Sequence, residues 1–292
     1  MSVIIPRSAA GSCLLVLALI LWGSLLAGPA LAGTRTVCPR GCAYSSIQAA
    51  VDAAVDGDTI LIQKGRFVEN VAISDKSLTL NGSGALLTVV DGGGTGRAFT
   101  VTGAFGVTRV SLSGMTITGG RTSDVGGGIA CGTGELTVTD SVVIHNTTQG
   151  LGAGIYTTCA QTSLIRTLIT LNNAAGAGLF DGGGGICAVS GVTLTLTDSI
   201  VAGNRATTDG GGLLGREVTI IATDSAIDRN RAGRFGGGIV IEAGRIVLGD
   251  SLVANNKAGQ DGGGLYSLDS AVSLGGTTAI IRNQPDDCTG CP

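Results

Sequence analysis

The chain is poor in the side chains on which many active sites and sugar-binding grooves depend. Its 292 residues include one histidine, one tryptophan, three tyrosines and five phenylalanines, and only 13% of its residues are charged. A catalytic pair of histidines is therefore excluded, and we expect His145 to lie in a solvated turn. Sparse charge with a formal net value of −3 gives no electrostatic footprint for nucleic acid, so no nucleic-acid partner is expected.

Long apolar runs are also scarce, and the one that is present lies near the N-terminus. Residues 13–27 are mostly apolar, Arg7 precedes them, and residues 30–32 supply the small residues of a cleavage site. The run is short for a bilayer and is broken by Gly23. We therefore assign residues 1–32 to a signal peptide. The mature chain is expected to have no membrane span and to be secreted or held at the cell surface.

Glycine, by contrast, is abundant and periodic. A Gly-Gly-Gly triplet, replaced by Gly-Ala-Gly in the second copy, recurs six times, and the spacings between its final glycines are 26, 31, 27, 26 and 26 residues. These glycines are Gly128, Gly154, Gly185, Gly212, Gly238 and Gly264. From Gly154 on, an asparagine lies 8 residues before each of these final glycines, except before Gly185, where the distance is 13. A period of this length predicts a solenoid, in which each repeat completes its core by stacking on its neighbours.

Apolar and polar residues alternate within each repeat, as they do in a strand with one buried face. Leu194 and Leu196 flank Thr195, for example, and equivalent positions in the other repeats follow the same alternation. Three such short segments per repeat predict an all-β fold, a single-chain right-handed parallel β-helix of about nine coils with three strands per coil. We assign residues 33–58 to an N-terminal cap with a short helix that begins after Ser45 or Ser46, and residues 59–292 to the β-helix.

The periodic asparagines are expected to be structural. They are Asn146, Asn172, Asn204, Asn230, Asn256 and Asn283. Stacked at one corner of successive coils, their amides can bond to one another along the axis and satisfy buried turn groups. Asparagine also tolerates the left-handed backbone that tight corners use.

Seven cysteines remain after the assigned cleavage, in a compartment that permits disulfides. Cys38 and Cys42 are close enough in sequence to pair, as are Cys288 and Cys291. Cys131 and Cys159 fall on neighbouring coils and form the third expected pair. The odd count leaves one thiol unassigned.

Several segments resemble known β-helix proteins. Residues 44–51, 57–60, 65–71 and 78–84 resemble the start of pectin-lyase-like right-handed β-helix proteins. The Gly-Gly-Gly-Ile and Val/Ile-x-x-Asn segments are similar to the repeats of polymorphic outer membrane proteins, with Val or Ile here in place of phenylalanine. The resemblance implies the fold, but it leaves function open, because this scaffold serves adhesins, autotransporter passengers and polysaccharide enzymes alike.

Four acidic residues are the weak catalytic candidates. Glu69 ends a Gly65-x-Phe67-x-Glu69 segment similar to one in pectin methylesterases, but the later catalytic segments of those enzymes are missing, and a turn role is expected for it. Asp198, Asp224 and Asp250 occupy equivalent positions of three coils. Carboxylates about 4.8 Å apart would repel one another or attract a cation such as calcium. Each is followed by serine, which favours ordinary turn chemistry instead.

Two further features are weaker candidates. Arg205, Arg231 and Lys257 each follow a periodic asparagine, and a basic column formed by them would relieve the repulsion among the aspartates. The long repeat, which starts at Asn172, carries five extra residues, and Phe180 and Asp181 are the side chains of that insertion suited to binding a partner.

These observations favour a non-catalytic protein, adhesin-like or displaying a rigid surface, without a cofactor and with a surface glycan or a protein as its ligand. The alternative is a carbohydrate-active enzyme, a polysaccharide lyase or pectin esterase-like, that acts on acidic polysaccharide through the aspartate column, with calcium as its cofactor.

Overall fold

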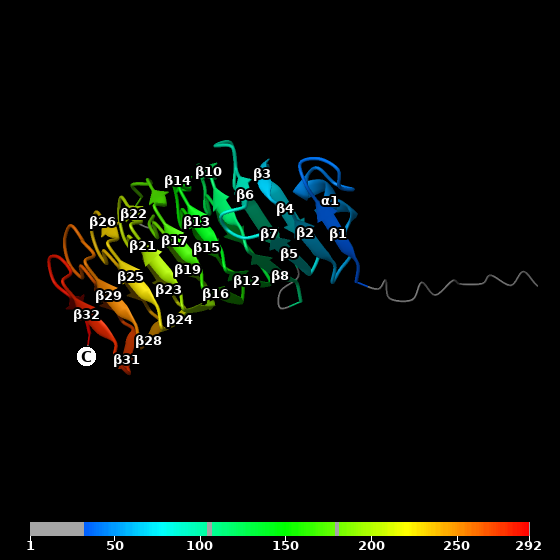
Figure 1. Ribbon diagram of the computed structural model, residues 1–292. Coiled ribbons are helices and arrows are strands. Elements are labelled where there is room, and N and C mark those ends of the chain that lie inside the picture. The colour runs from blue at the N-terminus through cyan, green and yellow to red at the C-terminus, as the bar shows by residue number, and fades with distance from the viewer. Residues whose placement is uncertain (1–31, 104–106, 179–180, 292) are drawn as a thin grey trace, which may run out of the picture. The chain divides into compact units, whose positions relative to one another are not determined.

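A computed structural model describes residues 32–103, 107–178 and 181–291. Ala32–Pro292 forms one compact unit, a stack of coils that runs from α1 to β32 (Figure 1). All pairings between the strands are parallel, so the predicted parallel β-helix is confirmed. The described residues contain no helix long and apolar enough to cross a membrane.

Three large sheets and one small sheet run along the stack, and we refer to the first two as sheets A and B. Sheet A contains β1 Thr34–Val37, β2 Thr59–Ile62, β5 Leu78–Gly82, β8 Arg109–Ser113, β12 Glu135–Thr139, β16 Gln161–Ile165, β20 Thr193–Thr197, β24 Thr219–Thr223, β28 Arg245–Gly249 and β31 Ala271–Gly275. Sheet B contains β3 Gly65–Val68, β6 Thr88–Asp91, β9 Thr116–Thr118, β13 Val142–Ile144, β17 Leu168–Thr170, β21 Ile200–Ala202, β25 Ala226–Asp228, β29 Leu252–Ala254 and β32 Ala279–Ile281.

Sheets C and D complete the coils. Sheet C contains β4 Val71–Ser74, β7 Phe99–Thr102, β11 Ile129–Cys131, β15 Ile155–Thr157, β19 Ile186–Val189, β23 Leu213–Arg216, β27 Ile239–Glu242, β30 Leu265–Leu268 and β33 Cys288–Thr289. Sheet D contains the two-residue strands β10 Arg121–Thr122, β14 Thr147–Thr148, β18 Asn173–Ala174, β22 Arg205–Ala206 and β26 Arg231–Ala232. The sequence did not predict sheet D. Sheet A has ten strands because β1, in the segment assigned to the cap, pairs with β2.

The register of the strands follows the repeat. Leu194 pairs with Ile220, and Leu196 pairs with Ala222, each 26 residues on. These inward side chains are at most 1% exposed, whereas Thr195 and Ile221, which lie between them, are partly exposed. The alternation seen in the sequence therefore marks the boundary between a continuous apolar core and the surface.

The periodic asparagines stack as a buried ladder. Asn204 Oδ1 accepts hydrogen bonds from the backbone N–H and the side-chain amide of Asn172, both at 3.0 Å. Asn204 Nδ2 donates to Asn230 Oδ1 at 3.0 Å and to the Ile169 carbonyl at 2.9 Å. The left-handed backbone lies one residue earlier in each coil, for example at Arg229 with φ 53°. The asparagines therefore act through their amides, and the residue before each of them supplies the turn.

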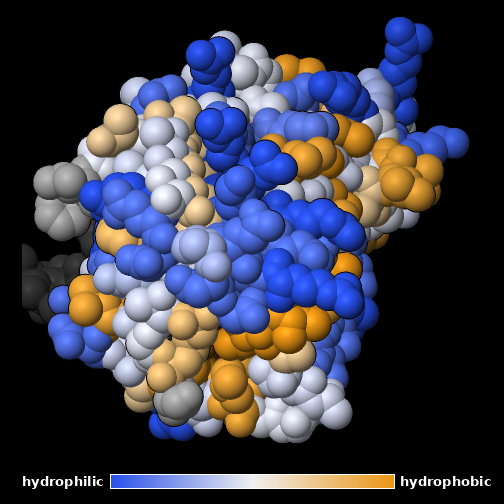
Figure 2. Space-filling view, turned by 90° about the vertical axis from the view of Figure 1, so that its left-hand side faces the viewer, coloured by the Kyte–Doolittle hydropathy of each residue, from blue (hydrophilic) through white to orange (hydrophobic). Residues whose placement is uncertain are grey.

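The two ends of the stack are finished differently. Helix α1, Ile47–Ala53, buries Ile47, Ala50 and Val51 against the first coils, and Ser46 caps it by accepting a hydrogen bond from the Ala49 N–H. The last coil exposes apolar side chains, namely Leu268, Leu274 and Ile281. Figure 2 looks onto this end and shows apolar surface open among polar side chains.

Three disulfides join Cys38 to Cys42, Cys131 to Cys159, and Cys288 to Cys291. They are the three expected pairs. Cys187 is the free cysteine of the described residues, and burial raises the pKa of its thiol to about 12. This thiol is a packing group in the native protein.

Candidate functional site

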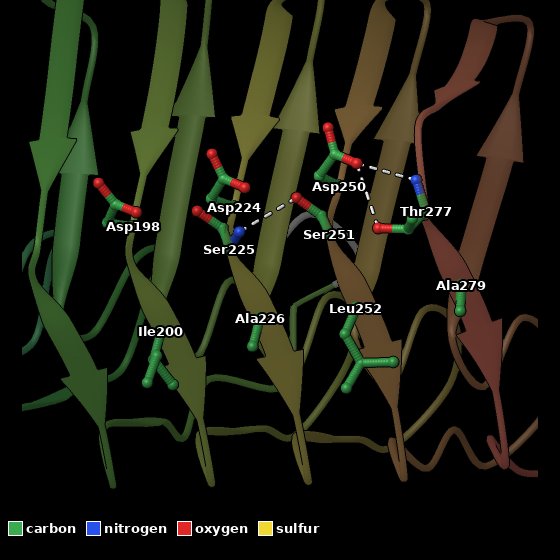
Figure 3. Close-up of a pocket in the computed structure, with 10 residues that line it drawn as sticks. All are labelled: Asp198, Ile200, Asp224, Ser225, Ala226, Asp250, Ser251, Leu252, Thr277 and Ala279. Atoms are coloured by element: carbon green, nitrogen blue, oxygen red, sulfur yellow. Dashed lines mark hydrogen bonds between the residues drawn. The ribbon is translucent and has the colours of Figure 1, made fainter.

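An open groove follows one edge of sheet B, and we call it the acid groove. Its volume is about 530 Å³, and it spans several coils (Figure 3). It is lined by Asp198, Ile200, Asp224, Ser225, Ala226, Asp250, Ser251, Leu252, Thr277 and Ala279. All three aspartates predicted to form a column lie in this groove.

The three aspartates sit at the corner between sheets A and B. Their φ values are 50°, 50° and 48°, in the left-handed region that aspartate tolerates better than most residues. Backbone bonds fix the stacking: the Asp198 N–H donates to the Thr223 carbonyl at 3.2 Å, and the Asp224 N–H donates to the Gly249 carbonyl at 3.1 Å. Carboxylates on neighbouring coils are therefore spaced by the strand repeat of about 4.8 Å.

The three carboxylates differ in what they bind. Asp250 Oδ1 accepts hydrogen bonds from the Thr277 N–H at 2.9 Å and from the Thr277 hydroxyl at 3.1 Å (Figure 3). The carboxylates of Asp198 and Asp224 accept no side-chain hydrogen bond and form no ion pair with any described residue. These two neighbouring acids are therefore open to an external ligand.

A fourth acid continues the corner column outside the groove. Arg166 donates to both oxygens of Asp140, at 2.7 and 2.9 Å, and this hydrogen bonding holds the pKa of the Asp140 carboxyl below its usual value. The charge of Asp198 also contributes to raising the pKa of Arg166. A guanidinium therefore lies at one end of the groove, beside Asp198.

The groove pairs its carboxylates with an aliphatic strip. Ile200, Ala226, Leu252 and Ala279 point out from sheet B, and Ile200 and Leu252 remain 46% and 39% exposed. Acceptors beside a flat apolar strip suit a ligand with hydroxyl groups on its rim and C–H groups on its face. Sequence reasoning missed this strip. The sequence did contain a signal for it, because each residue of the strip directly precedes a core residue in the second strand of its repeat, as Ile200 precedes Val201.

The aspartate column does not form a metal site. Across residues 32–103, 107–178 and 181–291, no three Asp, Glu, His or Cys side chains come close enough together to hold a metal ion. In Figure 3 the carboxylates of the column stand side by side on separate coils and do not converge on one point. Calcium takes six to eight oxygen ligands, so these residues do not fit the calcium of the predicted alternative.

Glu69 has a structural position at the N-terminus of α1. Its carboxylate accepts hydrogen bonds from the Ile47 N–H and the Gln48 N–H, both at 3.0 Å, and from the Ser46 hydroxyl at 2.8 Å. A carboxylate there satisfies unpaired amides and the positive end of the helix. Glu69 therefore joins the cap to the second coil, and it lies away from the acid groove.

The two candidates of the insertion have different outcomes. Phe180 lies outside the described residues. Asp181 Oδ2 accepts a hydrogen bond from the Gly178 N–H at 2.6 Å, and the Asp181 N–H donates back to the Gly178 carbonyl at 3.1 Å. The Asp181 carboxylate therefore closes a turn of its own loop.

The basic residues do not accompany the aspartates. Arg205, Arg231 and Lys257 line a second groove, with β22 and β26, at the opposite edge of sheet B. No ion pair joins them to the aspartate column in the part of the chain that the structure describes. The expected relief of carboxylate repulsion by this column is therefore absent, because the strands of sheet B separate the two rows.

The comparisons with known proteins inform the fold. No protein-family model matches the chain, and no curated protein matches it either. Among solved structures, pectin methylesterase PemA from Erwinia chrysanthemi aligns with a TM-score of 0.51 at 12% identity, over 87% of this chain and 93% of that one. Pectate lyase Pel9A aligns with a TM-score of 0.50 at 14% identity, over 85% of this chain and 78% of that one. The chain thus has the pectin-lyase-like parallel β-helix fold.

Proposed function

We propose that this protein is a secreted carbohydrate-active enzyme that hydrolyses an ester-bearing or neutral polysaccharide in the acid groove. The observation that carries the proposal is the pair of neighbouring carboxylates, Asp198 and Asp224, open to the groove without a protein partner. Two solved structures with the same fold are a pectin methylesterase and a pectate lyase, which supports polysaccharide chemistry over simple adhesion. The three disulfides agree with an extracellular location.

The two carboxylates can divide the work of hydrolysis. One acts as general base and removes a proton from water, whose oxygen attacks the ester carbonyl carbon. The other acts as general acid and gives a proton to the departing alkoxide, so that one water yields one acid and one alcohol.

The lining of the groove favours hydrolysis over elimination. A lyase removes a carbon-bound proton with a base and neutralises the adjacent carboxylate with a cation. The residues that line the acid groove include no Arg, Lys or His, and they do not fit calcium. Three carboxylates would also repel a polyanion. The acidic polysaccharide of the earlier alternative is therefore replaced by one whose acids are esterified, or by a neutral chain.

The test is turnover by variants that keep the corner intact. Asparagine tolerates the left-handed backbone as well as aspartate does, so Asp224→Asn and Asp198→Asn remove the charge without straining the turn. We expect methanol release from methyl-esterified pectin to fall about a hundredfold or more in each. Asp140→Asn is the matched control, since it changes the same corner position outside the groove.

Equal rates for Asp140→Asn and Asp224→Asn would contradict the proposal. So would the absence of turnover by the wild-type protein on esterified pectin, polygalacturonate and neutral glucans. Glycan binding without turnover would favour the second candidate, a non-catalytic surface protein with polymorphic outer membrane protein-type repeats. That candidate is supported by the left-handed φ of every aspartate in the column, a conformational reason for aspartate that needs no chemistry.

A further inference from the structure

The groove at the other edge of sheet B has the opposite charge, and we call it the basic groove. Its volume is about 260 Å³. It is lined by Arg205, Ala206, Thr207, Arg231, Ala232, Gly233, Lys257, Ala258 and Gly259. Three successive coils contribute the same three positions, so the groove repeats along the axis.

Its three cations are held in line by the backbone. Arg205 pairs in register with Arg231, which pairs with Lys257. Each step along the row is one strand spacing, about 4.8 Å. All three side chains are exposed, and none of them forms a hydrogen bond or ion pair with a described residue. A row of like charges at this spacing is self-repelling, and anions bound along it would remove that repulsion.

Acids on the neighbouring strands are already engaged. Asp228 forms an ion pair with Arg229 at 2.9 Å and accepts a hydrogen bond from Asn255 at 2.8 Å. Asp209, which is buried, pairs with Arg234. Neither carboxylate is available to neutralise the row, so its charge faces solvent.

The floor of the groove is made of small residues. Ala206, Ala232 and Ala258 are buried along it, and Gly233 and Gly259 also line the groove. A second hollow of about 480 Å³, which includes His145, adjoins it and shares Arg205 and Thr207. The shallow track therefore continues along the coils past the three cations and leaves room for an extended chain.

We propose that the basic groove binds an extended anionic glycan, whose carboxylate or sulfate groups lie along Arg205, Arg231 and Lys257. Guanidinium groups pair with such oxyanions in a two-point fork, and lysine adds a point charge. A regular row of cations suits a polymer that carries an anion on each repeating unit. This site is separate from the acid groove and does not depend on the reaction proposed there.

The lining of the basic groove favours a glycan over a single-stranded nucleic acid. Proteins that bind single strands combine a basic groove with aromatic rings on which bases stack. No Phe, Tyr or Trp is among the residues that line the basic groove or the adjoining hollow, whose one ring is the imidazole of His145. Saturated sugar rings need no such platform when charge supplies the attraction.

The test is calorimetric titration of the full chain at low salt with two probes, a heparin-derived octasaccharide for sulfate and an octagalacturonate for carboxylate. We expect at least one to bind, and the triple variant R205Q/R231Q/K257Q to weaken that binding about tenfold or more, with a shallower dependence on salt. Arg121→Gln is the matched control, because Arg121 lies in the same column on β10, outside the basic groove. Asp224→Asn should leave this affinity unchanged.

Circular dichroism of the triple variant checks that it folds, which is expected because all three side chains are exposed. The single variant Arg231→Gln provides a second measurement, with a smaller loss in the same direction. The proposal is overturned if neither probe binds the wild-type chain, if the triple variant binds as tightly as Arg121→Gln, or if a single-stranded oligonucleotide or poly-glutamate binds this groove more tightly than both glycans.

Discussion

Removing one amide from the middle of the asparagine ladder should destabilise the β-helix strongly. Asn204 is 1% exposed, and its side chain makes four hydrogen bonds. In Asn204→Ala, the Asn172 N–H loses its acceptor, and the Ile169 carbonyl loses a donor. Asn172 Nδ2 keeps its bond to the Val143 carbonyl. Two buried polar groups thus lose partners, at about 1–3 kcal/mol each, so we expect a loss of about 2–6 kcal/mol.

The assay is urea unfolding followed by circular dichroism, with Asn173→Ala as the matched control. Asn173 is the next residue after a ladder asparagine, it is partly exposed, and its side chain makes no hydrogen bond to a described residue. We expect its free energy of unfolding to stay within about 0.5 kcal/mol of the wild-type value. Amide exchange provides a local readout, because the orphaned Asn172 N–H should exchange faster in Asn204→Ala.

A midpoint for Asn204→Ala equal to that of Asn173→Ala would refute the reasoning. The same conclusion would follow if the Asn172 amide kept its protection, since the ladder would then be replaceable by water. Asn204→Asp separates hydrogen bonding from shape. The aspartate keeps an oxygen acceptor for Asn172. It replaces the amide donor, which faces the Ile169 carbonyl and Asn230 Oδ1, by a carboxylate oxygen, and so buries a negative charge against two acceptors. We therefore expect it to be at least as destabilising as Asn204→Ala at neutral pH.

Three further outcomes are expected. The Gly33 and Val55 backbone amides, with Arg35, lower the pKa of buried Asp58. The contribution of this carboxylate to stability is therefore present above about pH 4 and is lost as the pH falls through the lowered pKa. Acid titration of the unfolding midpoint should show this loss, and Asp58→Asn should abolish the pH dependence. Replacing Cys131 and Cys159 by serine should cost about 2–4 kcal/mol in urea unfolding, and an unchanged midpoint would contradict this. Iodoacetamide at pH 8 should leave the Cys187 thiol unlabelled in the native protein and label it after unfolding, as mass spectrometry would show.

What repeats in the sequence could be predicted from it. The stacking of Asn204 on Asn230, the Cys131–Cys159 disulfide and the aspartate column all follow from positions about 26 residues apart. Sheet D could not be predicted, because two residues are too few for alternation to be seen. The left-handed corners escaped for another reason: His145, Leu171 and Arg229 share a backbone conformation but no side-chain chemistry.

Contacts that occur in one coil alone could not be predicted from the sequence either. The bond from Glu69 to the first turn of α1 joins residues 22 positions apart and has no counterpart in other coils. The separation of the acid and basic grooves depends on the width of sheet B, which a list of periodic positions does not contain. Repetition reveals the columns that run along the axis, whereas distances around a coil require coordinates.

The insertion shows where this scaffold can change length. Asn172 still bonds to Asn204, and the Gly185 N–H still donates to the Gly212 carbonyl at 3.1 Å, although five extra residues separate the asparagine from the glycine in that coil. A side chain at Gly212 would meet the Gly238 carbonyl at 2.6 Å, so the glycine column itself admits no change. Foreign peptides grafted between an asparagine and its glycine would therefore project from the side of the β-helix without disturbing its core. One peptide per coil could be carried, and the strand spacing would set the distance between successive peptides.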